Sequence, residues 1–289
     1  MEGLKNMDNK KKILIIGASG YIGGHLNELL SKEGHQVYTT TNKSHLYGNS
    51  SIQFDFINSS HDILENWIKL SALNIDVAYV LAWPYLNDYK DERHVSEVLP
   101  KMIDLYKLLV NKCNIKNIVF TGTCFEYGKN GKLSETSDTK PTTNYAISKD
   151  ILRKILLNMA DKDNIKLKWV RLFFVMGGNQ RPTSLFPSLE KAIANGDKVF
   201  KMSKGDQIRD FILFEKVVSI LKQLGLKDEV PSGIYNCGSG TGYEVFELVE
   251  GYIKLRGSDM IIDNTAYPYR EDEPFAFWAD MSKTNKYLE

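Results

Sequence analysis

Short apolar runs alternate along the chain with longer segments in which apolar residues recur three and four positions apart. The short runs are typical of strands buried on both faces of a parallel sheet, and the longer segments are typical of amphipathic helices. Strands are predicted over residues 13–16, 36–40, 52–54, 77–81, 117–120 and 167–172, and helices over 21–31, 62–70, 98–113 and 151–159. This rhythm predicts an α/β fold with a doubly wound parallel sheet.

The first predicted strand runs directly into glycines spaced three apart, at Gly17, Gly20 and Gly23. Glycines let the chain turn sharply and let its backbone approach a pyrophosphate closely. The following helix, entered near Tyr21, would offer unpaired N–H groups and its positive dipole end to the anion. A glycine turn alone is a modest signal, but its place between a buried strand and a helix predicts a dinucleotide site.

Beyond Arg171 the pattern becomes less regular, with helices predicted over 185–195, 215–224 and 243–256 and a strand over 233–236. We expect residues 12–170 to form a dinucleotide-binding Rossmann domain, and residues 171–289 to form mainly a smaller α/β lobe that binds the substrate. No long linker separates the two parts, so they are expected to pack as one body. The polar residues 1–11 are expected to be a flexible tail outside the fold.

Composition narrows the classes of function. The chain has 37 Lys and Arg against 36 Asp and Glu, so no overall field favours nucleic acid or an anionic membrane. No stretch approaches the roughly 20 apolar residues of a membrane span, and the N-terminal segment lacks the apolar centre of a signal peptide. The three cysteines are widely spaced and match neither a disulfide framework nor a metal site. We therefore expect a cytoplasmic protein without a metal.

Tyr145 and Lys149 stand four positions apart just before a helical pattern, and on a helix this spacing places both side chains on one face. A tyrosine has a reference pKa of about 10, and a nearby ammonium is expected to lower this pKa by favouring the phenolate. Together the two groups make a general acid or base. A surface Tyr and Lys would show the same spacing, so the pair gains weight only from its context.

That context is a predicted strand, 117–120, that leads into hydroxyl groups at Thr121 and Thr123, on the edge where open α/β sheets bind ligands. At this point the chain resembles the extended short-chain dehydrogenase/reductase family, especially its NAD(P)-dependent nucleotide-sugar epimerases, dehydratases and 4-ketoreductases. The resemblance spans nearly all of residues 12–288. It rests on the glycine turn, on residues 123–128, on the Tyr145/Lys149 pair and on the Arg-Asp-Phe-Ile string at 209–212.

The resemblance implies a role for each matched residue. Thr123 would hydrogen-bond the reacting sugar oxygen, Tyr145 would exchange a proton with it, and Lys149 would bind the nicotinamide ribose and tune Tyr145. The implied cofactor-binding residues are Gly17, Ser19, Gly20, Tyr21, Ile22, Gly23, Thr41, Asn42, Lys43, Asp55, Phe56, Ala82, Thr121, Tyr145, Lys149 and Leu172. The candidate substrate-binding residues are Trp83, Glu126, Phe174, Arg181, Arg209 and Arg270.

Several of these substrate residues have structural alternatives. The arginines suit phosphate oxygens because guanidinium is a rigid fork, and the alternative for Arg209 or Arg270 is an exposed solubilising charge. Glu126 could orient a sugar hydroxyl, or it could cap or pair within its loop. Trp83 could be loop packing. Phe174 stands where several relatives carry an asparagine that helps to hold the substrate, which leaves the sugar open.

Two related chemistries lack their usual residues here. By the resemblance, 4,6-dehydratases carry an Asp-Glu pair directly after the catalytic Thr, where this chain has Cys124 and Phe125. The 3,5-epimerase-reductases use a cysteine two residues beyond the catalytic hydroxyl and a later histidine, whereas all five histidines here precede Tyr145. By the same resemblance, reduction or epimerisation at C4 would need only Thr123, Tyr145 and Lys149.

The end of the second predicted strand bears on the choice of cofactor. An NAD-binding relative would usually carry an acid near Thr41 to accept hydrogen bonds from the adenosine ribose, and here Asn42 and Lys43 follow instead. An acid would repel the extra phosphate of NADP, whereas hydroxyl, amide and ammonium groups can bind it. NADP(H) is favoured, and NAD(H) stays open because Lys43 could be a solvated loop charge.

The resulting interpretation is NADPH-dependent reduction of the C4 ketone of a nucleotide-linked 4-keto-6-deoxy sugar, as in the making of deoxy-sugar donors for surface glycans. One alternative is a nucleotide-sugar 4-epimerase that retains NAD. Another is a non-catalytic NAD(P)-sensing protein, against which the Tyr145/Lys149 pair argues because a sensor needs no proton donor. The expected partner is a nucleotide sugar, with no nucleic acid or membrane, and the resemblance also implies a homodimer.

Overall fold

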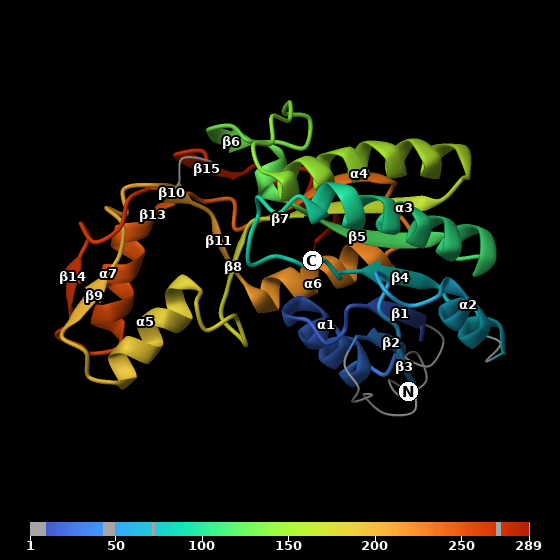
Figure 1. Ribbon diagram of the computed structural model, residues 1–289, viewed down its shortest axis with the longest axis horizontal. Coiled ribbons are helices and arrows are strands. Elements are labelled where there is room, and N and C mark those ends of the chain that lie inside the picture. The colour runs from blue at the N-terminus through green and yellow to red at the C-terminus, as the bar shows by residue number, and fades with distance from the viewer. Residues whose placement is uncertain (1–9, 43–49, 71–72, 270–272, 289) are drawn as a thin grey trace, which may run out of the picture.

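The computed structural model describes residues 10–42, 50–70, 73–269 and 273–288 (Figure 1). Seven parallel strands form the main sheet in the order β12-β7-β5-β4-β1-β2-β3. The strands are β1 Lys12–Ile16, β2 Gln36–Thr41, β3 Ser51–Gln53, β4 Val77–Val80, β5 Asn117–Thr123, β7 Lys166–Leu172 and β12 Gly233–Cys237. The order reverses between β1 and β4, which places the expected ligand crevice at the carboxyl ends of these strands. The predicted doubly wound α/β fold is confirmed.

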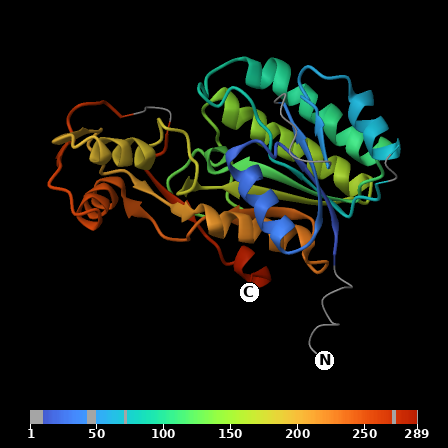
Figure 2. The same cartoon turned by 90° about the horizontal axis from the view of Figure 1, so that it is seen from below.

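Helices cover both faces of this sheet (Figures 1 and 2). One face carries α1 Tyr21–Lys32 and α6 Phe214–Leu226, and the other carries α2 His61–Leu70, α3 Leu99–Lys107 and α4 Asn144–Lys162. Alternate residues of β1 pack on opposite faces, because Ile13 belongs to the core cluster of Leu26 and Leu14 to that of Leu105. Burial on both faces explains why the strands read as unbroken apolar runs.

A second lobe lies to the left of the main sheet in Figure 1. Its helices are α5 Leu185–Ala194 and α7 Val245–Leu255, which pack around a core that includes Phe186, Phe200 and Val249. Short strands pair as β14-β9, β11-β8 and β13-β10-β15-β6. Their bounds are β6 Gly131–Leu133, β8 Phe174–Met176, β9 Val199–Lys201, β10 Ile208–Arg209, β11 Phe211–Leu213, β13 Tyr243–Glu244, β14 Ile261–Asp263 and β15 Ala276–Ala279.

Two segments after residue 171 belong with the main sheet rather than with the second lobe. Strand β12 pairs with β7, and α6 packs against α1. The carboxylate of Asp210, between β10 and β11, accepts hydrogen bonds from the backbone N–H groups of Ser239, Gly240 and Ala279, so it fastens three separate segments together. The chain therefore crosses between the two parts more than once, and the division at residue 170 stays a prediction.

Two further expectations concern the ends of the chain and membranes. Most of the tail predicted over 1–11 lies outside the described residues, which begin at Lys10. Within the described ranges, none of the helices has the length and apolar character that crossing a bilayer demands.

Candidate active site

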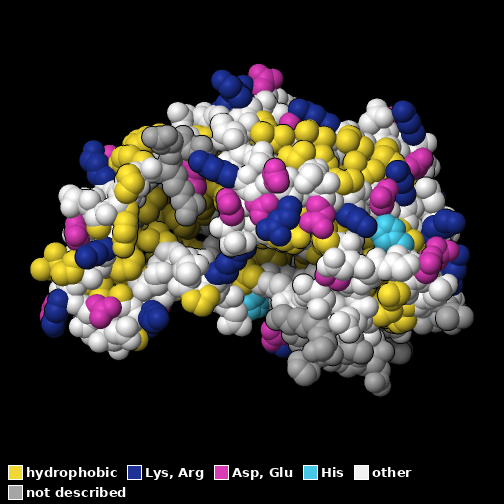
Figure 3. All heavy atoms as spheres, viewed as in Figure 1, with side chains coloured by type: hydrophobic (Ala, Val, Ile, Leu, Met, Phe, Trp, Pro, Cys, Tyr) yellow, Lys and Arg dark blue, Asp and Glu magenta, His cyan; other side chains and the backbone are white. Residues whose placement is uncertain are grey.

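A cleft with a volume of about 2660 Å³ runs along the carboxyl edge of the main sheet and into the second lobe. In the space-filling view it opens left of centre, with apolar side chains in its interior (Figure 3). Sites for single small molecules are typically about 300–1,000 Å³. The cleft therefore has room for two ligands side by side.

The glycine turn between β1 and α1 forms one end of the cleft. Gly17 has a φ of +95°, and a Cβ there would lie 2.7 Å from the backbone nitrogen of Ala82. A Cβ on Gly23 would lie 2.2 Å from the carbonyl oxygen of Gly17, so only glycine lets the helix meet the turn. Among the described residues no side chain caps the N terminus of α1, and its first turn has no acid. This cradle fits a dinucleotide pyrophosphate.

Every described residue that was predicted to bind the cofactor lines this cleft. They are Gly17, Ser19, Gly20, Tyr21, Ile22, Gly23, Thr41, Asn42, Asp55, Phe56, Ala82, Thr121, Tyr145, Lys149 and Leu172. Tyr21 also donates its hydroxyl hydrogen bond to the carbonyl of Gly177, and burial raises its pKa to about 12. Lys43 lies outside the described residues. The cleft thus brings the predicted set together, and the individual roles stay predictions.

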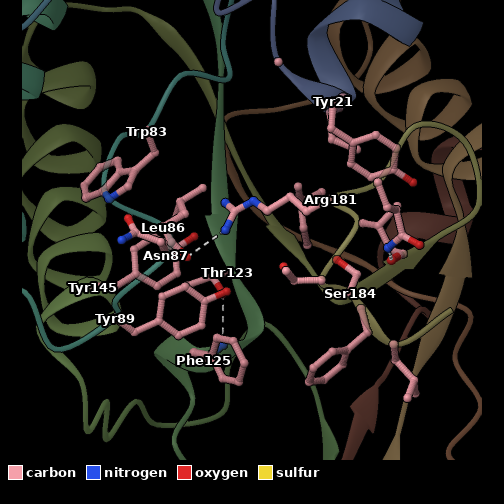
Figure 4. A pocket seen from close by; sticks show the side chains of 18 of the residues that line it. Tyr21, Trp83, Leu86, Asn87, Tyr89, Thr123, Phe125, Tyr145, Arg181 and Ser184 are labelled. Atoms are coloured by element: carbon pink, nitrogen blue, oxygen red, sulfur yellow. Dashed lines mark hydrogen bonds between the residues drawn. The ribbon is translucent and has the colours of Figure 1, made fainter. Parts of the chain in front are cut away.

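Helix α4 presents the Tyr145/Lys149 pair to the end of β5. The side chain of Thr143 caps the helix by accepting from the backbone N–H of Ala146, so the helix begins at Asn144, seven residues earlier than predicted. Tyr145 is 9% exposed and Lys149 4% exposed. The Thr123 hydroxyl lies near the Tyr145 phenol, where it partly offsets the rise in the pKa of that phenol, and Lys149 Nζ donates to the carbonyl oxygen of Thr121 at 2.7 Å. The three predicted catalytic residues therefore converge, and Figure 4 shows Thr123 and Tyr145 side by side.

The protonation of this pair differs from the prediction. Burial raises the pKa of Tyr145, and Lys149 does not lower it because the ammonium turns to Thr121 and lies 6.0 Å from the centre of the Tyr145 ring. Burial lowers the pKa of Lys149 to about 7, an effect that the Glu126 carboxylate opposes. At neutral pH Tyr145 accordingly keeps its proton, which is the form that a proton donor needs.

Aromatic rings enclose Tyr145 on the side of the loop that follows β4. The ring of Tyr89 stacks on it at 4.9 Å, and those of His94 and Trp83 lie at 5.4 and 5.8 Å. Trp83 Nε1 donates to His94 Nδ1 at 3.1 Å, and its ring lies 4.0 Å from Lys149 Nζ. Trp83 thus packs on the predicted catalytic pair. The sequence analysis missed Tyr89 and His94, although the run of aromatic residues after Ala82 was a signal.

Glu126 lies beneath the site and does not line the cleft. It is fully buried, and its Oε1 accepts from the backbone N–H of Thr123 and from Trp169 Nε1, both at 2.9 Å. Its Oε2 accepts from Arg171 Nε at 2.8 Å. With Thr123 it forms a capping box over the turn Cys124–Glu126. The capping and pairing alternative is what the structure shows, and the carboxylate contacts no ligand space.

Replacing Glu126 with Gln should lower the free energy of unfolding by about 3 kcal/mol, because removal of one member of a buried ion pair leaves the guanidinium of Arg171 uncompensated. Urea unfolding measures this directly. The matched control is Glu250→Gln, which breaks an exposed pair with Lys254 and should cost about 1 kcal/mol or less. Equal costs for the two variants would contradict the assignment of Glu126 to the scaffold.

The predicted phosphate-binding arginines differ in their surroundings. Arg209 is 5% exposed, lines the cleft and pairs with Glu273 at 3.1 Å, so a phosphate there would share its guanidinium with that carboxylate. Arg181 reaches across the cleft and donates to the carbonyl oxygen of Leu86 at 2.9 Å (Figure 4). Arg270 lies outside the described residues.

The residues that differ from the catalytic or substrate-binding residues of related enzymes have apolar surroundings in the structure. Phe125 and Phe174 line the cleft with their rings 5.7 Å apart. Cys124 is buried, and burial raises its pKa so that the thiol stays protonated. Neither Cys124 nor Phe125 supplies the acid and base that dehydration requires.

The model of the NAD dependent epimerase/dehydratase family matches residues 13–238, which is most of the chain. The chain belongs to this family. Membership confirms the resemblance drawn from the glycine turn, the hydroxyl groups after β5 and the Tyr145/Lys149 pair.

Curated relatives in the family include enzymes of different activity. The chain is 25% identical to dTDP-6-deoxy-L-talose 4-dehydrogenase (NAD(+)) from Aggregatibacter actinomycetemcomitans, over 92% of the chain and 98% of that protein. It is 28% identical to UDP-glucose 4-epimerase from Lactobacillus helveticus, over 96% and 91%. It is also 28% identical to CDP-abequose synthase from Salmonella typhimurium, over 91% and 88%.

Solved structures share the fold over nearly the whole chain. UDP-glucose 4-epimerase from Thermotoga maritima with UDP-glucose matches with a TM-score of 0.83 and 20% identity, covering 95% of the chain and 91% of that structure. The Bordetella bronchiseptica enzyme WbmG in complex with NAD matches with a TM-score of 0.81 and 22% identity, covering 99% and 90%. These matches confirm the Rossmann-type architecture.

Proposed function

We propose that this protein reduces the C4 ketone of a nucleotide-linked 4-keto-6-deoxy sugar. The observation that carries the proposal is the convergence of Thr123, Tyr145 and Lys149 at the end of β5, beside a cleft with room for a dinucleotide and a nucleotide sugar. Two relatives support chemistry at C4 of a 6-deoxy sugar, since both are named 4-dehydrogenases of 6-deoxytalose nucleotides. The missing acid–base residues at Cys124 and Phe125 argue against dehydration.

Reduced nicotinamide, when bound, supplies a hydride. The side chains of the chain do the rest. Tyr145, protonated at neutral pH because it is buried, donates its phenolic proton to the ketone oxygen. Thr123, held by Glu126 through its backbone N–H, places its hydroxyl beside the same oxygen. Lys149 lies behind the pair, held by the carbonyl oxygen of Thr121, where its Nζ would bind the nicotinamide ribose.

We propose NADP(H) as the cofactor. Strand β2 ends at Thr41, the exposed Asn42 follows, and both line the cleft. Neither side chain is a carboxylate that would repel an additional phosphate. The family is NAD-dependent and a solved relative holds NAD, so the preference for NADP(H) rests on this strand end alone.

The competing function is 4-epimerisation, which uses the same three residues. The relationship to UDP-glucose 4-epimerase supports it. An epimerase oxidises and re-reduces its substrate and therefore retains its dinucleotide, whereas a reductase exchanges the dinucleotide at every turnover.

Mixing the protein with NADPH and a 4-keto-6-deoxy nucleotide sugar should consume one equivalent of NADPH for each ketone. The loss of nicotinamide absorbance measures this consumption. We expect kcat/KM with NADPH to exceed that with NADH by about tenfold, the effect of an interaction of about 1.4 kcal/mol. Interconversion of two epimers by the protein with tightly bound NAD, with no net change in absorbance, would contradict the reductase function and support the epimerase function.

Three remaining expectations are proposals as well: a cytoplasmic location, a substrate-binding role for most of residues 171–289, and a homodimer. For the homodimer we propose α3 and α4 as the interface. The two helices pack against each other on one face of the sheet. Val95, in the turn before α3, is 40% exposed, and Ile151 on α4 is 37% exposed, so both are free to meet a second copy.

A further inference from the structure

Three phenylalanine rings form a continuous wall in the cleft. The wall consists of Phe125, Phe174 and Phe211, all of which line the cleft and are only partly buried. The ring centres of Phe125 and Phe174 lie 5.7 Å apart, and those of Phe174 and Phe211 lie 5.6 Å apart. The rings come from the turn after β5, from β8 and from β11, so the fold assembles the wall from three separate segments.

The wall begins beside the reacting groups. The backbone N–H of Phe125 donates to Thr123 Oγ1 at 3.3 Å, and the ring of Phe125 lies 5.6 Å from that of Tyr89, which stacks on Tyr145 (Figure 4). A ketone carbon placed at Thr123 and Tyr145 therefore has its neighbouring ring carbons next to Phe125.

The middle ring of the wall, Phe174, meets a cation. The guanidinium of Arg209 lies 5.5 Å from the centre of the Phe174 ring, inside the same cleft. Phe125 and Phe174 thus lie between the groups that would act on C4 and an arginine suited to a diphosphate on C1. A sugar in this position lays one of its edges along these two apolar rings.

We propose that this wall selects sugars with a methyl group at C5, so that Phe174 and Phe125 contact C6 as a methyl and disfavour a hydroxymethyl. This proposal rests on the proposed function, which sets the position of C4 in the cleft. Contact with aromatic carbons stabilises a methyl group by removing its apolar surface from water, whereas a hydroxyl pressed against them loses its hydrogen bonds to water. Apolar pockets discriminate by one such group by roughly 10- to 100-fold. The residues of the wall therefore separate 6-deoxy sugars from ordinary hexoses.

Calorimetric titration of the NADP-loaded protein tests this without turnover. The probes are 6-deoxygalactose and galactose, each linked to dTDP, CDP, GDP and UDP, and the comparison is made on the nucleotide that binds best. We expect the 6-deoxy sugar to bind 10- to 100-fold more tightly. Equal affinities, tighter binding of galactose, or no binding of either sugar on any nucleotide would overturn the proposal.

Variants assign the preference to the wall. Phe174→Asn should bring the ratio of affinities close to one, because the amide can bond the added hydroxyl, while Phe174→Leu should keep most of it. Leu255→Asn is the control, since Leu255 is 80% exposed and outside the cleft lining. A folded Phe174→Asn with an unchanged ratio would overturn the assignment, and if that variant does not fold, Phe125→Asn takes its place with the same expected result, because Phe125 is the other ring proposed to contact C6.

The two proposals fail separately. If no 4-keto sugar consumes NADPH but the 6-deoxy sugar still binds more tightly, the proposed reduction is wrong and the proposed selection by the wall is supported. If NADPH is consumed while the two sugars bind equally, the proposed selection by the wall is wrong and the proposed reduction is supported.

Discussion

Tyr145→Phe lowers kcat by about 1,000-fold, within the range of 10²–10⁴ that general acids contribute, and leaves KM and stability close to those of the wild type. The substitution removes the proton donor alone. The ring keeps its stacking on Tyr89 at 4.9 Å and its edge contact with Trp83 at 5.8 Å, so the site stays assembled. The measurement is the steady-state rate of NADPH oxidation with a 4-keto nucleotide sugar.

The control for this prediction is Tyr252→Phe. Tyr252 bonds Glu190 in the second lobe and does not line the cleft, so its loss of a hydroxyl should leave kcat unchanged. If Tyr145→Phe kept a tenth or more of the wild-type kcat, another group would have to supply the proton.

Gly23→Ala weakens NADPH binding by about 100-fold or more, the usual result of displacing a positioning element by about 1 Å. The added Cβ would lie 2.2 Å from the carbonyl oxygen of Gly17 and 2.9 Å from Cα of Ala18, and both are backbone atoms that cannot rotate away. Helix α1 therefore has to move away from the turn. Fluorescence titration with NADPH measures the effect as a change in Kd.

Gly24→Ala is a control in the same helix. A Cβ there meets its nearest neighbour, the carbonyl oxygen of Ala18, at 3.5 Å, which is an ordinary contact. Both variants exchange Gly for Ala inside α1 and gain the same helix propensity of about 1 kcal/mol. Equal values of Kd for the two variants would mean that the close approach at Gly23 does not shape the dinucleotide site.

The sheet could be predicted because its strands are buried on both faces. All four residues of β4 are buried, as are four of the five residues of β1, and such strands leave unbroken apolar runs in the sequence. Strands β6, β8–β11 and β13–β15 left no such signal, since each spans only two to four residues. A period cannot show over so short a length, and only tertiary pairing makes these segments strands.

The site was predictable where its residues are close in sequence. Tyr145 and Lys149 share one helix face, and the three glycines share one turn. The place of Glu126 was not predictable, because its partners Trp169 and Arg171 lie 43 and 45 residues away. The protonation of Tyr145 was mispredicted for a related reason: burial by distant segments governs its pKa, and sequence spacing does not report burial.

The central claim is that a hydride from NADPH ends at C4 of a sugar while Tyr145 supplies the proton. A single turnover with NADPH that carries deuterium at both C4 positions of the nicotinamide tests it, with the product analysed by mass spectrometry and NMR. The account predicts one deuterium at C4 of the sugar and one equivalent of NADP⁺. An unlabelled sugar with intact NADPH, whether unchanged or epimerised, would contradict it.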